Sequence, residues 1–332
     1  MPENMQKLQK LRSWNTLKFL LAIGLVLFIL KKVDFAYIPQ LGERLSWNWL
    51  FLRWFLLILM LLIKSYQYFV LIDGIPYFDV LHIVVWQNTL SNFVSNGAGI
   101  ASYMTMLKTE QNVKLSRSGA TFVIVKFGDL AVVCVYLALS ASMVWTKIPE
   151  LQHFTLLLIL GIVLSLALFL ATIVQKEKFV SLLSRLAVGL KLDTFSLTRR
   201  GLDWLRSLAD QDEKKIFLLL RKSLLVSLLY MSVTMLYAYT VVGIFDLPIG
   251  VWEALYIAAL LQLVSFIPIQ VLGGLGVADL TMVYLYGVFG IPQTEMSTIS
   301  LGLRAFFYLM NAGIFLYLPL SALFRKLKTK KV

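Results

Sequence analysis

Charged side chains within long apolar segments are the residues of this sequence best suited to chemistry. Lys126 and Asp129 lie one helical turn apart in TFVIVKFGDLAVV, and Arg304 lies in TISLGLRAFFYLM. At membrane depth a charge costs at least about 2.5–3.5 kcal/mol, so it must face other helices or water. Lys126 and Asp129 can neutralise each other. Arg304 has no acid within one helical turn, so we expect Asp279 or Glu253 as its partner. The sequence leaves two roles open for the arginine: a structural ion pair, or a fork that binds an anionic headgroup.

Three asparagines recur at intervals of four residues. Asn88, Asn92 and Asn96 would lie on one face of a helix. Asparagine in a membrane helix commonly forms hydrogen bonds between helices. A polar stripe along a wet cavity is the alternative, and the sequence favours neither.

A glycine-rich break precedes the arginine helix. Gly273, Gly274 and Gly276 follow Pro268 and precede the apolar stretch VADLTMVYLYG. Unwound backbone at membrane depth is tolerated where it is buried in protein or lines a cavity. A helix that starts after such a break presents free N–H groups, which attract anions. We therefore expect an anion site beside Arg304.

The composition predicts that these residues sit in a membrane protein. Of 332 residues, 59% are hydrophobic and 15% are charged, and the mean hydropathy is +0.79. Soluble domains carry about 25% charged residues. The net charge of +13 comes from basic residues in short hydrophilic segments, as in cytoplasmic loops. Nucleic acid is therefore not an expected partner.

Cysteine and histidine are too sparse for several kinds of site. The single Cys134 cannot form a disulfide within the chain, and His82 and His153 are far apart. The sequence has no cluster with metal-ligand spacing, no nucleophile elbow and no phosphate-binding glycine loop. We therefore expect no catalytic residues, no metal and no cofactor.

The apolar segments predict an all-α, polytopic membrane protein. A segment of about 20 apolar residues spans a bilayer. Two further stretches, 79–107 and 251–290, are apolar but interrupted by Gly, Pro, Asn and Gln, and we expect each to form a re-entrant hairpin of broken helices. Two full short spans in each stretch are the alternative. The six full spans are expected at 16–36, 47–72, 119–144, 151–174, 216–245 and 296–324.

Charge predicts the orientation. Segment 175–215 holds nine basic residues, and the tail RKLKTKK holds five with no acid. The positive-inside rule places both in the cytoplasm, together with the N-terminus. Lys31 and Lys32 then fall on the outer side, against the rule. In span 47–72, Arg53 and Lys64 are expected near the two ends, with their charges at the interfaces.

The two halves of the chain resemble each other with opposite orientation. Gly99 precedes Lys126 by 27 residues, and Gly276 precedes Arg304 by 28. Inverted repeats with broken helices are an architecture of transporters, whose substrate site lies where the breaks meet. The first repeat lies in 1–174, which also contains the first span of the second repeat, 151–174. A basic connector follows at 175–215, and 216–332 completes the second repeat.

Two short motifs carry a resemblance to a known family. The stretch PIQVLGGLGVAD, which ends at Asp279 and precedes Arg304, and the stretch VKFGD around Lys126 resemble the flippase-like transmembrane domain of lysylphosphatidylglycerol synthases. That family includes proteins once named dolichol-phosphate-glucose synthetases. Position 279 is Asp where the family typically has Glu. The first-half motif NGAGIASY lacks the family's usual proline and arginine. We expect no aminoacyl-transferase domain after the last span, so the resemblance implies movement of a lipid between leaflets.

We therefore expect a transporter for an anionic phospholipid or a polyprenyl-linked lipid in a prokaryotic cell membrane, with homo-oligomers as a further option. A transferase acting on polyprenyl phosphate and a membrane scaffold are the alternatives. In the transporter, phosphate would contact Arg304, Lys126 and the glycines, and hydroxyls would contact the asparagines. Ion pairs that open and close the path would use Asp129, Asp279 and Glu253.

Overall fold

The computed structural model describes residues 38–72, 74–189, 213–266 and 274–319. They form α-helices joined by 3₁₀ turns and loops, so the all-α prediction is confirmed. The helices are α2 (Ile38–Arg44), α3 (Trp47–Phe69), α4 (Tyr77–Phe93), α5 (Asn96–Gln111), α6 (Leu115–Val144), α7 (Gln152–Gly189), α9 (Glu213–Phe245), α10 (Val251–Ser265), α11 (Val277–Val288) and α12 (Gln293–Phe315).

Five helices are long and apolar enough to cross a membrane. They match five of the six expected spans, and the sixth, 16–36, lies outside the described residues. Helix α7 has large apolar side chains such as Leu157 and Leu160 exposed by more than 60%, as expected for a surface that faces lipid. The chain is therefore an integral membrane protein. Helix α7 also continues to Gly189, so part of the expected basic connector is helical. The sidedness of the termini stays a prediction.

Both interrupted segments consist of two helices. Helices α4 and α5 have 17 and 16 residues, and α10 and α11 have 15 and 12, so each is short for a span of about 20. The predicted breaks are thus confirmed, whereas the re-entrant path and the inverted symmetry stay predictions.

Local chemistry accounts for each break. In the first, the hydroxyl of Ser95 accepts a hydrogen bond of 3.2 Å from the Ala98 N–H and thereby caps the start of α5. In the second, Gly274 and Gly276 have φ angles of +84° and +86°, which residues with a Cβ rarely adopt. The glycines therefore allow the turn that leads into α11.

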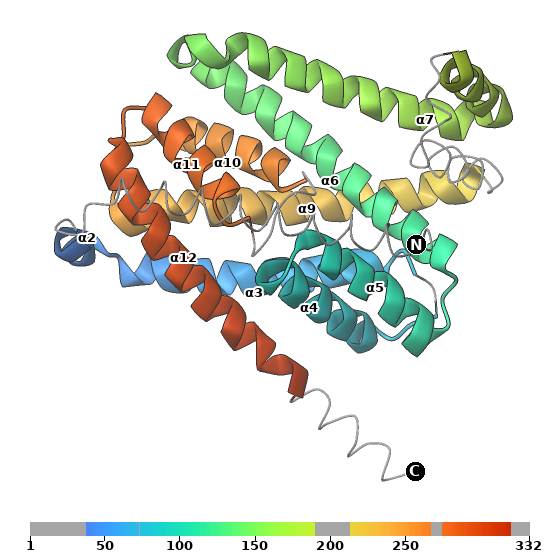
Figure 1. Ribbon diagram of the computed structural model, residues 1–332, viewed down its shortest axis with the longest axis horizontal. Helices are drawn as coiled ribbons and strands as arrows, with labels where there is room; N and C mark the ends of the chain where they lie inside the picture. The colour runs from blue at the N-terminus through green and yellow to red at the C-terminus, as the bar shows by residue number, and fades with distance from the viewer. Residues whose placement is uncertain (1–37, 73, 190–212, 267–273, 320–332) are drawn as a thin grey trace, which may run out of the picture.

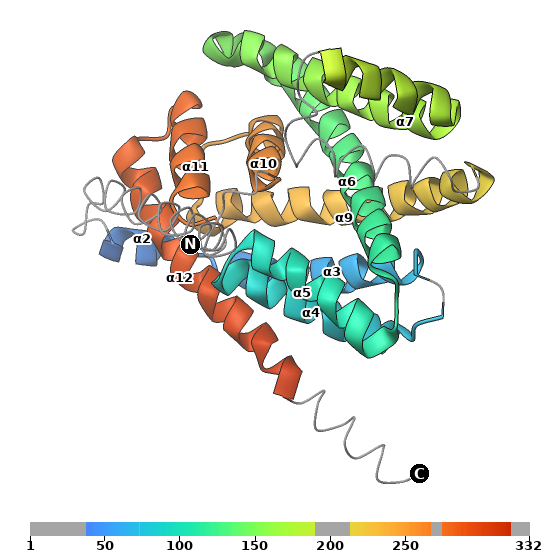
Figure 2. The same ribbon diagram turned by 45° about the vertical axis from the view of Figure 1, so that its right-hand side comes forward.

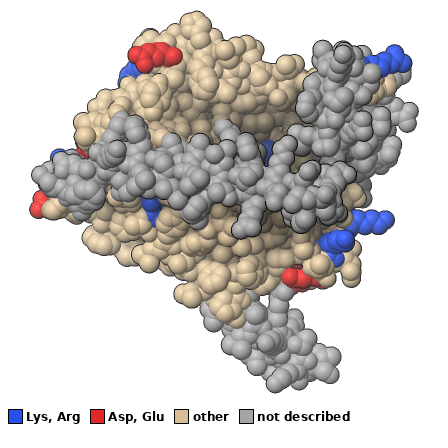
Figure 3. Space-filling view, viewed as in Figure 1, with Lys and Arg blue, Asp and Glu red and all other residues tan. Residues whose placement is uncertain are grey.

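The bundle is organised around α3 and α9, which pack side by side (Figures 1 and 2). In both views α10 and α11 lie on one side of this pair, and α4 and α5 lie on the other. Helix α6 packs against α9 and α10, and α12 packs against α11 and α4. In the space-filling view, charged side chains lie mainly at the margins, and tan residues occupy most of the visible surface between them (Figure 3). The spanning helices also expose many large apolar side chains, among them Phe51 of α3 and Leu229 of α9.

Candidate functional site

The two helix breaks contact each other. Asn96, at the start of α5, donates a hydrogen bond of 3.3 Å from Nδ2 to the backbone oxygen of Ser265, at the end of α10. The ammonium of Lys126 lies 5.0 Å from the ring centre of Phe266, the residue that follows α10. A lysine of the first half therefore lies beside the break of the second half.

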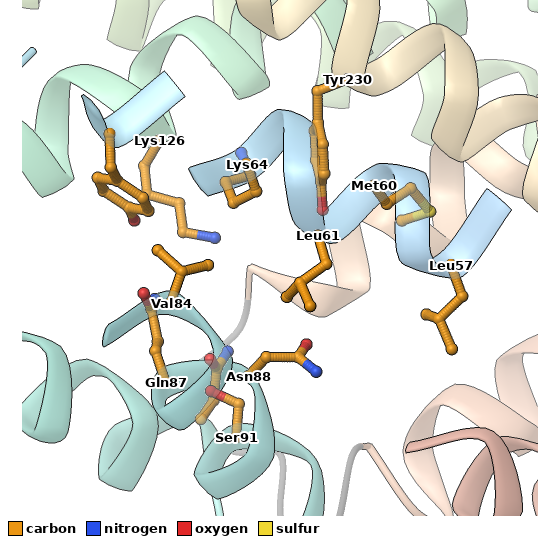
Figure 4. Close-up of a pocket in the computed structure, with 12 residues that line it drawn as sticks. Leu57, Met60, Leu61, Lys64, Val84, Gln87, Asn88, Ser91, Lys126 and Tyr230 are labelled. Carbon is orange, nitrogen blue, oxygen red and sulfur yellow. The ribbon is translucent and has the colours of Figure 1, made fainter. Parts of the chain in front are cut away.

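A polar cavity of about 170 Å³ lies next to these breaks. In Figure 4 the Lys126 side chain extends into the space between α6 and α4, and Gln87, Asn88 and Ser91 lie on the α4 side of that space. We call it the lysine cavity. A water needs roughly 10–15 Å³ of such volume, so the cavity can hold several waters or a small polar group. It is lined by Leu57, Met60, Leu61, Lys64, Tyr68, Val84, Gln87, Asn88, Ser91, Asn96, Lys126 and Tyr230.

Asp129 forms its salt bridge with Lys64 on α3 and not with Lys126, with which the sequence allowed it to neutralise its charge. The energetic coupling of Lys126 to Asp129 stays a prediction. Lys64 Nζ lies 2.7 Å from Asp129 Oδ2. Ser227 donates to Asp129 Oδ1 at 2.9 Å, and Gln67 donates to the same oxygen at 3.5 Å. Both charged side chains are at most 15% exposed. The expectation that Lys64 reaches a membrane interface is therefore wrong, because its ammonium is held inside the bundle.

Lys126 has no salt-bridge partner among the described residues. Within the part of the chain that the structure describes, its ammonium has no ion pair or hydrogen bond, and its neighbours are the rings of Phe266 and Phe122. Gln87 Oε1 is buried without a hydrogen-bond partner on the α4 side of the cavity. The cavity therefore offers a positive charge and an acceptor that the described residues leave unused.

Arg304 is paired with Asp279, one of its two predicted partners. Arg304 Nε lies 2.6 Å from Asp279 Oδ1, and Arg304 Nη2 donates to the Gly274 carbonyl at 3.2 Å. Ser300 also donates to Asp279, at 3.1 Å. The alternative prediction, a pair of Arg304 with Glu253, is wrong. Glu253 lies at the start of α10 and pairs with Lys147 at 2.5 Å.

The carboxylate of Asp279 lies at the N-terminal end of α11, where a helix has unpaired N–H groups. Asp279 Oδ2 accepts a hydrogen bond of 2.9 Å from the Gly276 N–H. A negative side chain at a helix N-terminus is favourable. An anion at this glycine-rich start would therefore have to replace or share the carboxylate. Gly274 contacts Arg304 and Gly276 contacts its partner Asp279, whereas Gly273 lies outside the described residues.

The asparagines form hydrogen bonds between helices and also line a cavity, so each of the two predicted roles is found in part. Asn88 and Asn92 donate from Nδ2 to Asn311 Oδ1 on α12 at 3.2 and 2.8 Å, so they form hydrogen bonds between helices. Asn88 and Asn96 also line the lysine cavity. Asn96 does not share a helix with the others, because α4 ends at Phe93 and Asn96 begins α5.

Arg53 is a further residue that differs from its expected position at an interface. It is only 9% exposed, and its Nη1 donates to the Tyr237 carbonyl and the Thr240 hydroxyl, each at 2.9 Å. Of the polar residues that sequence reasoning missed, Lys64 and Gln67 are neighbours on α3, whereas Ser227 on α9 is 160 residues from Gln67. Only the packing of α3, α6 and α9 reveals that they meet at Asp129. Their one sequence signal is a polar side chain in an apolar helix.

Comparison with known proteins adds one match. The family model described as lysylphosphatidylglycerol synthase TM region matches residues 15–314. Searches of curated proteins and of solved structures give no match.

Proposed function

This chain belongs to the lysylphosphatidylglycerol synthase transmembrane-region family, and on that premise we propose that it moves an anionic lipid or a lipid-linked sugar between the two bilayer leaflets. Membership and the five apolar helices establish a membrane protein of a lipid-related family. Transport itself is our proposal. The protein would act as a transporter without catalytic residues or cofactor.

The position of Lys126 is the observation on which the proposal mainly rests. Its charge lies in a helix long enough to span the membrane, faces the lysine cavity and forms no salt bridge among the described residues. An ionisable side chain inside a membrane protein is costly and typically marks a substrate or ion path. A phosphate in the cavity would balance this charge, and Asn88 and Gln87 would contact neighbouring hydroxyls.

An apolar cavity beside the lysine cavity supports a lipid as the substrate. It has a volume of about 260 Å³ and lies between α3, α4 and α12. Leu61 lines both cavities. A polar headgroup in the lysine cavity could therefore leave its chain against the apolar walls next to it, so that neither part of the lipid would be placed in an unfavourable medium.

The ion pairs would regulate passage. Arg304 and Asp279 join α12 to the break before α11, and Lys64 and Asp129 join α3 to α6. A lipid phosphate that competes with either carboxylate would loosen one of these links. The transport would follow the lipid gradient or be coupled to an ion.

Reconstitution of the full chain into liposomes tests the proposal. Fluorescent phosphatidylglycerol in the inner leaflet is protected from a membrane-impermeant quencher, and its movement outward makes it accessible. We expect wild type to accelerate this movement and Lys126→Gln to abolish most of the acceleration. Lys108→Gln is the matched control, because Lys108 is an exposed lysine on α5. Equal rates with empty liposomes would contradict the proposal. A chemically altered headgroup in the same sample would favour the transferase alternative.

A further inference from the structure

Arg53 is a buried cation whose charge no described carboxylate balances. Its two hydrogen bonds go to neutral groups, the carbonyl of Tyr237 and the hydroxyl of Thr240, and its guanidinium lies 3.9 Å from the Tyr237 ring centre. Both bonds come from Nη1, so the N–H groups of Nε and Nη2 have no hydrogen-bond partner within the described part of the chain. Among the described residues the side chain of Arg53 therefore has a charge without a carboxylate partner and N–H donors that form no hydrogen bond.

Arg53, which carries these donors, lines a second cavity. The cavity has a volume of about 190 Å³, and Arg304 and Asp279 line it together with Arg53. We call it the arginine cavity. Asp279 is already paired with Arg304 at 2.6 Å. Because the charged lining consists of two arginines and one aspartate, it has one net positive charge.

The arginine cavity repeats the charge pattern of the lysine cavity. Each is lined by one cation that is held in an ion pair, Lys64 in one and Arg304 in the other, and by one further cation, Lys126 or Arg53. Asp279 also lines the arginine cavity, whereas the partner of Lys64, Asp129, lies behind the wall of the lysine cavity. Helix α3 contributes a cation to both cavities: Arg53 lines the arginine cavity and Lys64 lines the lysine cavity. Lys64 follows Arg53 by 11 residues. At 1.5 Å per residue, the two positions are roughly 16 Å apart along the helix, about half the thickness of a hydrocarbon core.

We propose that the arginine cavity is a second anion-binding site, in which Arg53 binds the phosphate group of a membrane lipid. A guanidinium fork matches phosphate geometry through two N–H donors. The apolar side chains of Leu261, Met282 and Phe307 also line the cavity, so the phosphate would lie beside apolar surface. The inference rests on the proposed function for the identity of the ligand; the charge and the free donors do not depend on it. A soluble phosphate ester would share this chemistry.

Ligand-dependent thermal stability tests the site without transport. The full chain carrying Lys126→Gln, which removes the free cation of the lysine cavity, is heated in neutral detergent with increasing phosphatidylglycerol. Phosphatidylcholine with the same chains measures the effect of a neutral lipid, and glycerol phosphate that of a soluble ester. We expect phosphatidylglycerol to raise the unfolding midpoint above the phosphatidylcholine value. Adding Arg53→Gln to the Lys126→Gln protein should weaken its apparent affinity for phosphatidylglycerol by about tenfold or more, because a charged hydrogen-bond donor is lost.

Two variants make the result specific. Arg44→Gln removes an exposed arginine just before α3 and should leave the phosphatidylglycerol effect unchanged. Ala278→Leu narrows the arginine cavity while leaving Arg53 in place, so it should reduce the effect even if Arg53→Gln does not fold. An unchanged effect in both Arg53→Gln and Ala278→Leu would overturn the site.

The remaining outcomes separate the site from its alternatives. If Arg53→Gln lowers the midpoint without lipid and leaves the lipid effect intact, the arginine is structural and the proposal is wrong. If glycerol phosphate gives the same effect as the lipid, the anion site stands and the lipid assignment is overturned. Failure of wild type to move lipid in liposomes, with this Arg53-dependent binding intact, would contradict the proposed transport alone.

Discussion

Lys64 and Asp129 are 65 residues apart in the sequence, yet their side chains form an ion pair of 2.7 Å between α3 and α6. Ser227 of α9 also donates to the same carboxylate, so a single buried charge links three helices. The pairing leaves Lys126 free of Asp129 as a direct partner, although Lys126 precedes it by only one helical turn. Because Asp129 pairs with Lys64, the charge of Lys126 gives the lysine cavity its positive character.

Removal of one member of the Lys64–Asp129 pair should destabilise the protein strongly. Asp129→Asn leaves Lys64 buried without a counter-charge, which typically costs about 3–5 kcal/mol. Lys64→Met alone should cost a similar amount, and the double variant should recover part of the loss. Reversible unfolding in mixed micelles measures the three free energies. In the parallel cycle of Asp129→Asn with Lys126→Met we expect a smaller coupling, and equal coupling in the two cycles would contradict the observed pairing.

Gly128 permits the close approach of α6 to α9 beside Asp129. A Cβ at this position would lie 2.7 Å from the Ser227 hydroxyl and 3.0 Å from the Ser223 hydroxyl. Gly128→Ala should therefore destabilise by about 1–3 kcal/mol, as overpacking does. Gly119→Ala on the same helix is the control, because nothing lies within 4 Å of its added Cβ. That variant should be neutral or gain up to about 1 kcal/mol from helix propensity. Equal unfolding midpoints for the two variants would contradict the tight contact.

The ion pair of Glu253 and Lys147 should make a small, pH-dependent contribution to stability. The hydrogen bond from Lys147 lowers the pKa of Glu253 below its ordinary value of 4.5, and this residue lies outside the five spanning helices. A carboxyl whose pKa is lowered by folding stabilises the protein above its unfolded pKa, and this contribution disappears as the pH falls through the folded pKa. Because the Lys147 side chain is 61% exposed, the effect should be below about 1 kcal/mol.

Unfolding midpoints of wild type and Glu253→Gln between pH 7 and pH 3 check this contribution. The difference between them should be largest near neutral pH, vanish at the acidic end and shrink in high salt. A difference that grows as the pH falls would show that the sign is wrong.

The sequence predicts the elements of this fold better than their contacts. Gly274 and Gly276 identify a break because their backbone conformation requires glycine, and a break is a local property. Arg304 can be matched to Asp279 because segment 251–290 contains only two acids, Glu253 and Asp279. The partner of Asp129 depends on how α3, α6 and α9 are rotated against each other. Helical periodicity does not determine that rotation in apolar helices whose faces are all similar. The sequence therefore predicts interface positions for Lys64 and Arg53, whereas both side chains lie inside the bundle.

Arg304 connects α12 to the break before α11 through two of its nitrogens. Nε binds Asp279 and Nη2 binds the Gly274 carbonyl. An ammonium group keeps the charge but lacks the planar fork that reaches two partners in fixed directions. The consequences of Arg304→Lys therefore separate a requirement for charge from a requirement for geometry.

We expect Arg304→Lys to fold with a loss of about 1 kcal/mol, the usual value of one hydrogen bond, and to move lipid much more slowly than wild type. Arg304→Ala should lose both stability and transport, because it leaves Asp279 buried without its charged partner. Unfolding midpoints and liposome rates are measured on the same preparations. Arg44→Lys is the control and should change neither quantity, since the exposed Arg44 side chain forms a long pair of 3.6 Å with the partly buried Glu295. If Arg304→Lys is stable and transports at the wild-type rate, the arginine acts as a charge only, and its two-pronged contact with a lipid phosphate is wrong.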